Sequence, residues 1–269
     1  MSIALKPFCQ KEPKTIDKPT KELYNYKRKA DRKDGFIVLK DFKIKPPFFE
    51  VGPKALLYGE KMLKLAQVID KTAMKYDLDV IVTPQYTDIS LLANNTERIL
   101  VFAQHMDPLP VGRGLGSVLP EAVKAAGAVG VMLNHAEKKL TLDVVEKTIA
   151  RADEVGLATI VCADTVEELT AIAKLGPNLL VAEPTELIGT GKTSDSNYVI
   201  ETIKQVRDIN PDIMVLQGAG ISNGQDVYNT IKLGAQATGS TSGILKAADP
   251  EAMVEEMLYN LRKAWDEMH

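Results

Sequence analysis

The sequence predicts an α/β protein built as a (β/α)8 barrel with an N-terminal extension. From Phe36 onward, short apolar runs alternate with longer amphipathic runs, and the alternation fits eight β/α units in roughly 235 residues. The apolar runs are almost wholly nonpolar and rich in β-branched residues, as expected of parallel strands buried on both faces. A doubly wound sheet would alternate in the same way, so the count of eight is what favours the barrel.

The N-terminal region differs from the rest of the chain in charge. Residues 1–34 carry ten Lys/Arg and five Asp/Glu, a local balance of +5, whereas the whole chain carries −3. They contain three prolines and little apolar periodicity. We therefore predict a basic extension over 1–34 and a barrel domain over 35–269. The basic clusters at 27–29 and 32–33 lack the aromatic platform of a nucleic-acid site, so a solvated arm and no nucleic-acid partner are expected.

The remaining elements follow from periodicity and end signals. Helices are predicted at 141–155, ending at Gly156; at 165–175, with Asp164 and Glu167 resembling a capping box; at 223–233, ending at Gly234; and at 250–265. An earlier helix has Met62, Leu65, Ala66 and Ile69 on one face. The predicted strands are 36–39, 80–84, 99–104, 129–134, 158–162, 179–182, 213–217 and 235–239.

Composition excludes several classes of protein. The chain has two cysteines, Cys9 and Cys162, which give no disulfide framework and favour a reducing, cytoplasmic setting. No Cys/His cluster has metal-ligand spacing, so no metal site is expected. No apolar run reaches the length of a membrane span, and the first residues lack the apolar stretch of a secretory signal.

Polar residues gather at the predicted carboxyl ends of the strands, where barrels of this kind carry their chemistry. Glu183 ends the sixth strand and is followed by a proline and a glycine-rich loop that could close over a ligand. A carboxylate beneath a mobile lid is suited to proton abstraction. The seventh and eighth strands end in small-residue turns at 218–222 and 239–243, whose exposed N–H groups suit an anion such as phosphate.

These motifs resemble the triosephosphate isomerase family, and its archaeal branch in particular. The run 183–193, Glu-Pro-Thr-Glu-Leu-Ile-Gly-Thr-Gly-Lys-Thr, is similar to the family's catalytic glutamate and hinged lid. The segment 134–137, Asn-His-Ala-Glu, resembles its His-Ser-Glu segment, with Ala136 in place of Ser. The segments at 104–108, 118–124, 218–222 and 241–243 are similar to the archaeal branch as well. The resemblance implies a TIM barrel and a cofactor-free isomerase of a small phosphorylated sugar, with triose phosphate as the leading substrate.

The resemblance also implies roles for individual residues. The family is a well-known example of a glutamate base paired with a neutral histidine. Glu183 would move the proton between adjacent carbons, and His135 would polarise the carbonyl. Lys43 would stabilise negative charge, with Glu137 behind it as its ion-pair partner. The phosphate would be held by backbone N–H groups of Gly189, Ser222, Ser242 and Gly243.

Two departures from the family pattern bear on substrate and rate. The family has Asn two residues before its catalytic lysine. With Lys43 as that lysine, this chain has Asp41 at the corresponding position in the substrate pocket. An ionised Asp accepts hydrogen bonds but cannot donate one. Leu115 stands where the family has a Thr that reaches a neighbouring subunit in a homodimer or homotetramer. Two alternatives therefore stay open: an isomerase of a four-carbon ketose phosphate, and a phosphate-ligand binding protein without turnover.

Overall fold

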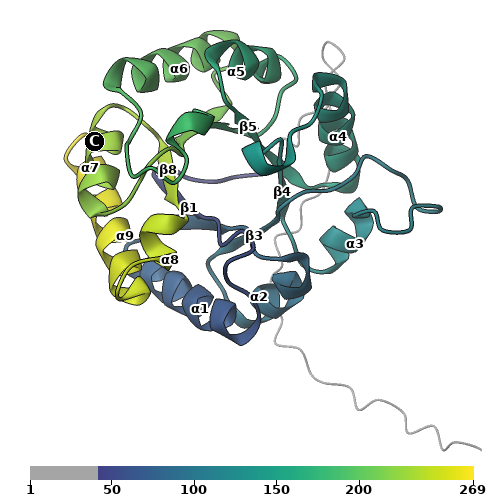
Figure 1. Ribbon diagram of the computed structural model, residues 1–269, viewed down its shortest axis with the longest axis horizontal. Coiled ribbons are helices and arrows are strands. Elements are labelled where there is room, and N and C mark those ends of the chain that lie inside the picture. Colours follow the sequence, from purple (N-terminus) through teal and green to yellow (C-terminus); the bar gives the residue numbers. More distant parts are fainter. Residues whose placement is uncertain (1–41) are drawn as a thin grey trace, which may run out of the picture.

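Strand β1 (Phe48–Val51) both opens and closes the barrel. The structure is a computed structural model and describes residues 42–269. In it β1 pairs in parallel with β2 (Asp79–Val82) on one side and with β8 (Ala237–Ser240) on the other, so that Phe48 lies opposite Asp79 and Ala237. All eight strands follow one another in chain order around a closed parallel barrel, and helices form the outer ring (Figure 1). The predicted fold class is confirmed for this part of the chain.

The other elements alternate as the sequence pattern predicted. The remaining strands are β3 (Leu100–Ala103), β4 (Gly130–Leu133), β5 (Ala158–Ala163), β6 (Leu179–Ala182) and β7 (Met214–Gln217). The helices are α1 (Gly59–Lys75), α2 (Ile89–Asn95), α3 (Pro120–Ala125), α4 (Leu142–Val155), α5 (Val166–Ala173), α6 (Ser196–Ile209), α7 (Gly224–Lys232), α8 (Ser242–Leu245) and α9 (Pro250–Asp266). Short 3-10 turns follow β2, β4 and β6: η1 (Tyr86–Asp88), η2 (Ala136–Lys138) and η3 (Thr185–Leu187).

The predicted first strand was wrong. The barrel closes with Phe48–Val51, whereas the predicted strand at 36–39 lies outside the described residues. Both segments are short and apolar and are followed by charged residues, but Phe48–Val51 contains Glu50 in the middle of an otherwise nonpolar run. A charged residue argues against a strand buried on both faces. The closure of the barrel overrides this local signal.

Most helix ends follow the predicted signals, with one shift. Gly156 ends α4 in the left-handed conformation, at φ 76°. Asn223 caps α7 by accepting a hydrogen bond from the Asp226 N–H. The predicted capping box at Asp164 and Glu167 was one residue early, because Thr165 is the cap and accepts from the Glu168 N–H.

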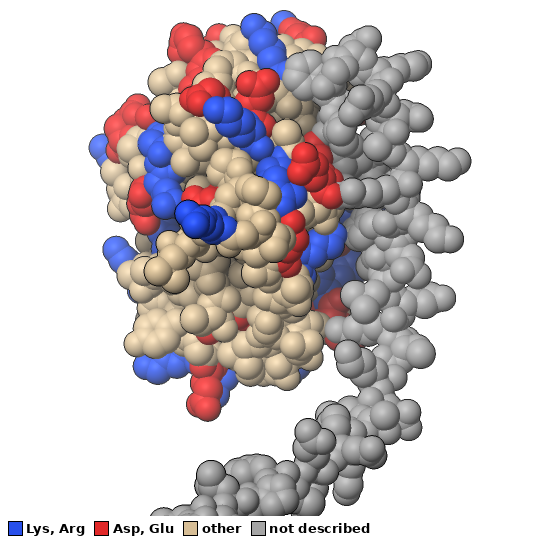
Figure 2. All heavy atoms as spheres, turned by 90° about the vertical axis from the view of Figure 1, so that its right-hand side faces the viewer, with Lys and Arg blue, Asp and Glu red and all other residues tan. Residues whose placement is uncertain are grey.

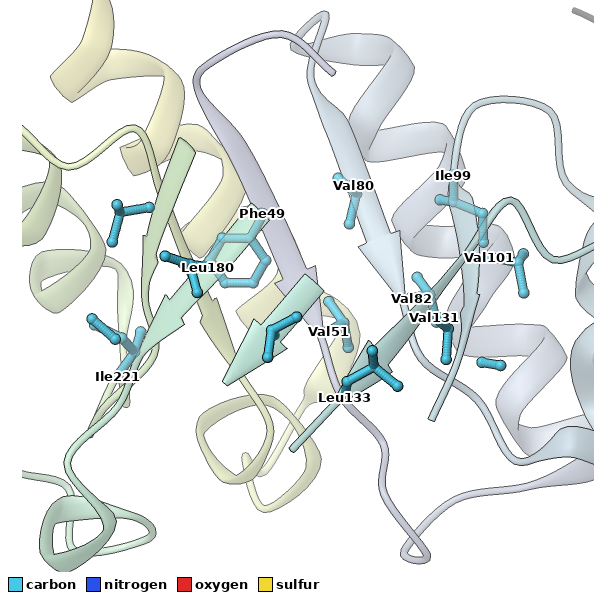
Figure 3. Close-up of a cluster of buried hydrophobic side chains, with 14 of the residues drawn as sticks. Phe49, Val51, Val80, Val82, Ile99, Val101, Val131, Leu133, Leu180 and Ile221 are labelled. Carbon is cyan, nitrogen blue, oxygen red and sulfur yellow. The ribbon is translucent and has the colours of Figure 1, made fainter. Parts of the chain in front are cut away.

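The core has two parts that meet at the barrel wall. Alternate residues of β1 point outward, so Phe49 and Val51 pack with helix side chains in the cluster shown in Figure 3. Phe48 points inward and joins a second cluster inside the barrel, together with Phe102 and neighbouring strand residues. A Cβ atom on Gly130 would lie 2.3 Å from the Phe102 ring, so glycine is needed for this close approach. The upper residues of this interior cluster form the floor of the cavity described below.

The surface around α3 and α4 carries charges of both signs. Figure 2 shows acidic and basic side chains interspersed on this face. Several are paired, for example Arg151 with Glu121 and Glu154, and Lys147 with Asp143. A solvent-exposed pair such as Lys147 with Asp143 contributes little to stability, about 0–1 kcal/mol. Among the described residues, no helix is long and apolar enough to cross a membrane.

Candidate active site

A cavity of about 420 Å³ opens at the carboxyl ends of the strands, within the size range of small-molecule sites. Each strand of the barrel contributes to it directly or through the loop that follows. Its floor is largely apolar and its walls carry polar and charged groups. The lining includes Glu50, Lys54, Thr83, Gln104, His135, Glu137, Cys162, Glu183, Leu216 and Gly239.

Glu183 stands at the end of β6, at the predicted position. Its side chain is 15% exposed. Burial raises the pKa of the carboxyl to about 7, against the opposing charge of Lys54. A carboxyl in this range can hold a proton and release it near neutral pH, which a general base requires. Glu183 therefore has the electrostatic environment of a proton-transfer group.

His135 lies opposite Glu183, with 3.8 Å between its Nε2 atom and Oε2 of the glutamate. The Glu137 backbone N–H donates a hydrogen bond to Nδ1 at 3.1 Å. Because Nδ1 accepts, the proton of a neutral ring is on Nε2, which points into the pocket. Burial, followed by the positive charge of Lys54, lowers the pKa of the imidazole. His135 is thus a neutral donor directed at the space beside the Glu183 carboxyl.

Lys54, three residues after β1, is a lysine of the pocket wall that faces Glu137. Its Nζ atom lies 2.7 Å from Oε1 of Glu137, and this hydrogen bond lowers the pKa of the carboxyl. The Lys54 backbone is left-handed, at φ 51°. A non-glycine residue in this region costs of order 1–3 kcal/mol and persists only where neighbours fix it. The side-chain amides of Gln85 and Gln104 do so by donating to the Lys54 carbonyl, at 2.7 and 2.9 Å.

One residue predicted for this corner is not found in the pocket, and another lies outside the described residues. Lys43 is exposed, precedes β1 and does not line the cavity; Lys54 makes the predicted ion pair with Glu137 in its place. The error follows directly from the misplaced first strand, which shifted the expected strand end by twelve residues toward the N-terminus. Asp41, predicted to contact the substrate, lies outside the described residues.

Asn134 belongs to the motif at 134–137 but is not among the predicted site residues, and it holds the β4 loop in place. Its backbone is left-handed, at φ 58°. The side-chain amide donates to the Cys162 carbonyl and to Glu168, both at 2.9 Å, and its oxygen accepts from the Leu140 N–H at 2.8 Å. Since these bonds join β4 to β5 and α5, they fix the peptide from which His135 extends.

A second cavity, of about 350 Å³, lies over the ends of β6, β7 and β8. Gly189 and Ser242 line it, in agreement with their predicted place. Ser222 and Gly243 are not among its lining residues, and the Ser222 N–H donates to Asp226 at 2.9 Å, so this donor is already occupied. Lys246, which the sequence reasoning missed, lines the same cavity. The sequence signal for Lys246 is only its position, about one turn of helix after the small-residue loop at 239–243.

The lid segment after Glu183 contains two glycines in the left-handed conformation, Gly189 at φ 72° and Gly191 at φ 73°. Its far end packs on the turn after β7. A Cβ atom on Gly220 would lie 1.9 Å from the Lys192 carbonyl oxygen, so only glycine permits this contact. The lid and the β7 turn are therefore fitted to each other over the second cavity.

Comparisons with known proteins agree with this geometry. A family model described as triosephosphate isomerase matches residues 57–257. The chain is 36% identical to a triosephosphate isomerase of Sulfurisphaera tokodaii over 83% of this chain and 99% of the relative, and 39% identical to one of Methanobacterium bryantii over 74% and 89%.

A solved structure supports the fold. The crystal structure of triosephosphate isomerase from Bartonella henselae superposes with a TM-score of 0.66 at 16% identity, over 82% of this chain and 99% of the other. The match to the family model begins three residues after Lys54, so β1, which contains Glu50, falls outside the match. With the barrel, the Glu183 and His135 pair and these relatives in agreement, the chain belongs to the triosephosphate isomerase family.

Proposed function

We propose that this chain is a cofactor-free aldose–ketose isomerase that interconverts dihydroxyacetone phosphate and glyceraldehyde 3-phosphate through an enediolate. The observation that carries the proposal is the pairing of Glu183 with His135. A buried carboxyl with a pKa of about 7 and a neutral imidazole donor face the same space, 3.8 Å apart. Proton transfer between two adjacent carbons needs one base and one donor to the oxygens, and the pair supplies both.

In the proposed reaction the ionised Glu183 removes a proton from the hydroxymethyl carbon of the ketose. His135 donates from Nε2 to the carbonyl oxygen, which becomes negative as the C–H electron pair moves to form the enediolate double bond. His135 next gives its Nε2 proton to the former carbonyl oxygen and takes the hydroxyl proton of the first carbon in exchange, so that one proton passes from one oxygen to the other. The protonated Glu183 then returns its proton to the neighbouring carbon while the electron pair on the deprotonated oxygen forms the new C=O bond, which yields the aldose. Atoms balance without any other reactant, because the carboxyl is regenerated at the end.

Charge in the two cavities supports a phosphorylated substrate. Lys54 faces the reacting end, and its attraction for developing negative charge is strengthened by the low dielectric of the pocket. We propose that the phosphodianion lies in the second cavity, near Gly189, Ser242 and Lys246. Ser222 and Gly243 would then support the turns from behind rather than bind the anion through their own N–H groups.

The relatives favour the triose substrate over the alternatives. The curated relatives of Sulfurisphaera tokodaii and Methanobacterium bryantii carry the name triosephosphate isomerase. Neither the four-carbon ketose phosphate nor the binding protein without turnover receives support from them.

The test is isomerisation in D₂O followed by NMR. The wild-type protein should convert either triose phosphate to the other and place deuterium on the carbon that Glu183 reprotonates. Glu183→Gln keeps the size of the side chain but lacks the basic oxygen, and should lower kcat by at least ~10²-fold. Unchanged turnover in this variant would remove Glu183 from the mechanism.

We also propose that the working unit is a homodimer or homotetramer in the cytoplasm. The loop between β3 and α3 projects from the barrel (Figure 1) and exposes two large apolar side chains, Val111 at 70% and Leu115 at 107%. Apolar side chains at a projecting tip are costly to leave in water and favour contact with a second copy. Sedimentation should show an oligomer that Leu115→Asp weakens; a monomeric wild-type protein would contradict the proposal.

The cytoplasmic setting is supported by the buried free thiol of Cys162.

A further inference from the structure

Glu50 is a second buried carboxyl of the pocket and takes no part in the proton transfer above. It lies in the middle of β1, points into the barrel and is 9% exposed. Thr83 at the end of β2 donates a hydrogen bond to its Oε1 atom at 3.0 Å. Among the described residues, Thr83 is the one hydrogen-bond partner of this carboxyl, which leaves Oε2 available to a ligand.

Two glycines make room for this carboxyl. A Cβ atom on Gly52 would lie 3.0 Å from Oε1, and one on Gly239 would lie 3.0 Å from Oε2. Both distances are tighter than nine in ten real Cβ contacts, so the Glu50 carboxyl occupies space that side chains at 52 and 239 would need. Gly52 stands two residues before Lys54, the place at which the family carries an amide side chain. Glu50 lies two residues before Gly52, one layer of side chains deeper in the barrel, and its carboxyl reaches the pocket wall from there.

The surroundings of Glu50 disfavour its ionised form. Burial raises the pKa of the carboxyl to about 7; the Thr83 hydrogen bond opposes this, Glu183 adds to it and Lys54 opposes it. On the other walls, the loop after β3 presents His105 and Asp107, and β4 with its loop presents His135, Glu137 and Lys138. β5 presents the Cys162 thiol, and β7 and β8 present the uncharged Leu216 and Gly239. A bound phosphodianion would add negative charge and stabilise the protonated carboxyl further.

We propose that Glu50 contacts the substrate as a neutral acid, donating a hydrogen bond from Oε2 to an oxygen at the reacting end of the sugar phosphate. The identity of the substrate in this proposal rests on the proposed function, whereas the hydrogen-bond donation by Glu50 does not. An ionised Glu50 beside the enediolate would repel it, whereas a protonated one stabilises it. The active protein would therefore hold one proton on the two carboxyls, with Glu50 protonated and Glu183 ionised.

The proposal predicts how activity depends on pH. Activity rises as Glu183 loses its proton and falls as Glu50 loses its own, so kcat/KM follows a bell whose alkaline side belongs to Glu50. Glu50→Gln replaces the acid by an amide, which donates at every pH. This variant should keep most of the wild-type activity at pH 6 and exceed the wild type at pH 8.5.

The matched variant is Glu50→Val, which fills the floor with an apolar side chain and removes the donor. It should lose ~10²-fold in kcat/KM, the usual cost of deleting one donor to a reacting oxygen. Glu146→Gln changes an exposed carboxyl on α4 and should keep the wild-type bell. Circular dichroism checks that each variant is folded.

A second measurement does not depend on turnover. Glycerol 3-phosphate carries a phosphodianion and hydroxyls but cannot isomerise. Its binding to Glu183→Gln at pH 8 should be accompanied by proton uptake, measured by calorimetry in buffers of different ionisation enthalpy. The uptake should disappear when Glu50→Gln is added to the same protein.

The outcomes separate this proposal from the isomerase activity. If the wild type turns over neither triose phosphate but proton uptake depends on Glu50, the contact stands and the substrate is wrong. If Glu50→Val has the wild-type activity and pH profile, Glu50 is not in contact with substrate. If Glu50→Gln is as inactive as Glu50→Val at pH 6, the site needs a carboxylate rather than a donor, and the proposal is overturned.

Discussion

Glu183→Gln should make the folded protein more stable while it removes activity. In the wild type the ionised carboxyl is held in a pocket that disfavours its charge, since burial raises the pKa from 4.5 to about 7. Glutamine has nearly the same shape and no charge to bury. The variant therefore lacks both the base and the energetic penalty of ionising it.

The size and sign of the effect follow from the two pKa values. A carboxyl whose pKa is higher in the folded state contributes stability below pH 4.5, and this contribution is lost as the pH rises through about 7. At about 1.4 kcal/mol per pH unit, the full loss is roughly 3 kcal/mol. Between pH 5 and pH 8 the stability of Glu183→Gln relative to wild type should rise by roughly 2.5 kcal/mol. The figure is an upper value, because Glu50 shares the same pocket and titrates together with Glu183.

Urea unfolding followed by circular dichroism measures this difference at both pH values. Urea is preferred to guanidinium because it leaves the ionic strength, and with it the electrostatic contribution, unchanged. The control is again Glu146→Gln on α4, where the carboxyl is exposed. Its stability relative to wild type should be the same at pH 5 and pH 8.

An equal stability difference for Glu183→Gln at pH 5 and pH 8 would refute the reasoning. It would mean that the carboxyl ionises in the folded protein as readily as in the unfolded chain. The pocket would then not raise its pKa, and the case for a base that works near neutral pH would be lost.

Three further predictions use the same structure. Lys54→Met should lower kcat/KM by about 10²-fold or more, because the lysine that pairs with Glu137 is removed. Lys43→Met should stay near wild type in the same assay, and the reverse result would make Lys43 the lysine of the site. Inorganic phosphate should inhibit competitively, and Lys246→Ala should raise its inhibition constant, since the ammonium group lines the second cavity; inhibition indifferent to this change would move the anion elsewhere. Deleting residues 1–34 should leave kcat near the value of the full chain in a steady-state assay, and a folded but inactive deletion protein would show that this region supplies part of the site.

The sequence determined the architecture and pointed to the two residues that we propose transfer the proton, Glu183 and His135. The alternation of apolar and amphipathic runs predicted the barrel, and seven of the eight predicted strands overlap the observed ones. Glu183 and His135 were identified because each lies in a motif that resembles the family and follows an apolar strand, and the ends of parallel strands meet on one face of a barrel. These features are local in the chain, so a periodic pattern and a short motif are enough to reveal them.

The tertiary structure alone decided which strand begins the barrel, and with it the lysine. Segments 36–39 and Phe48–Val51 are both short and apolar, and only the pairing of Phe48 with Asp79 and Ala237 shows which one completes the ring. Strand closure is a long-range property that no local pattern records. Glu50 remained hidden for the same reason, because a charged residue argues against a buried strand. Its room beside Gly52 and Gly239, and the pKa that burial gives it, exist only once distant strands are brought together.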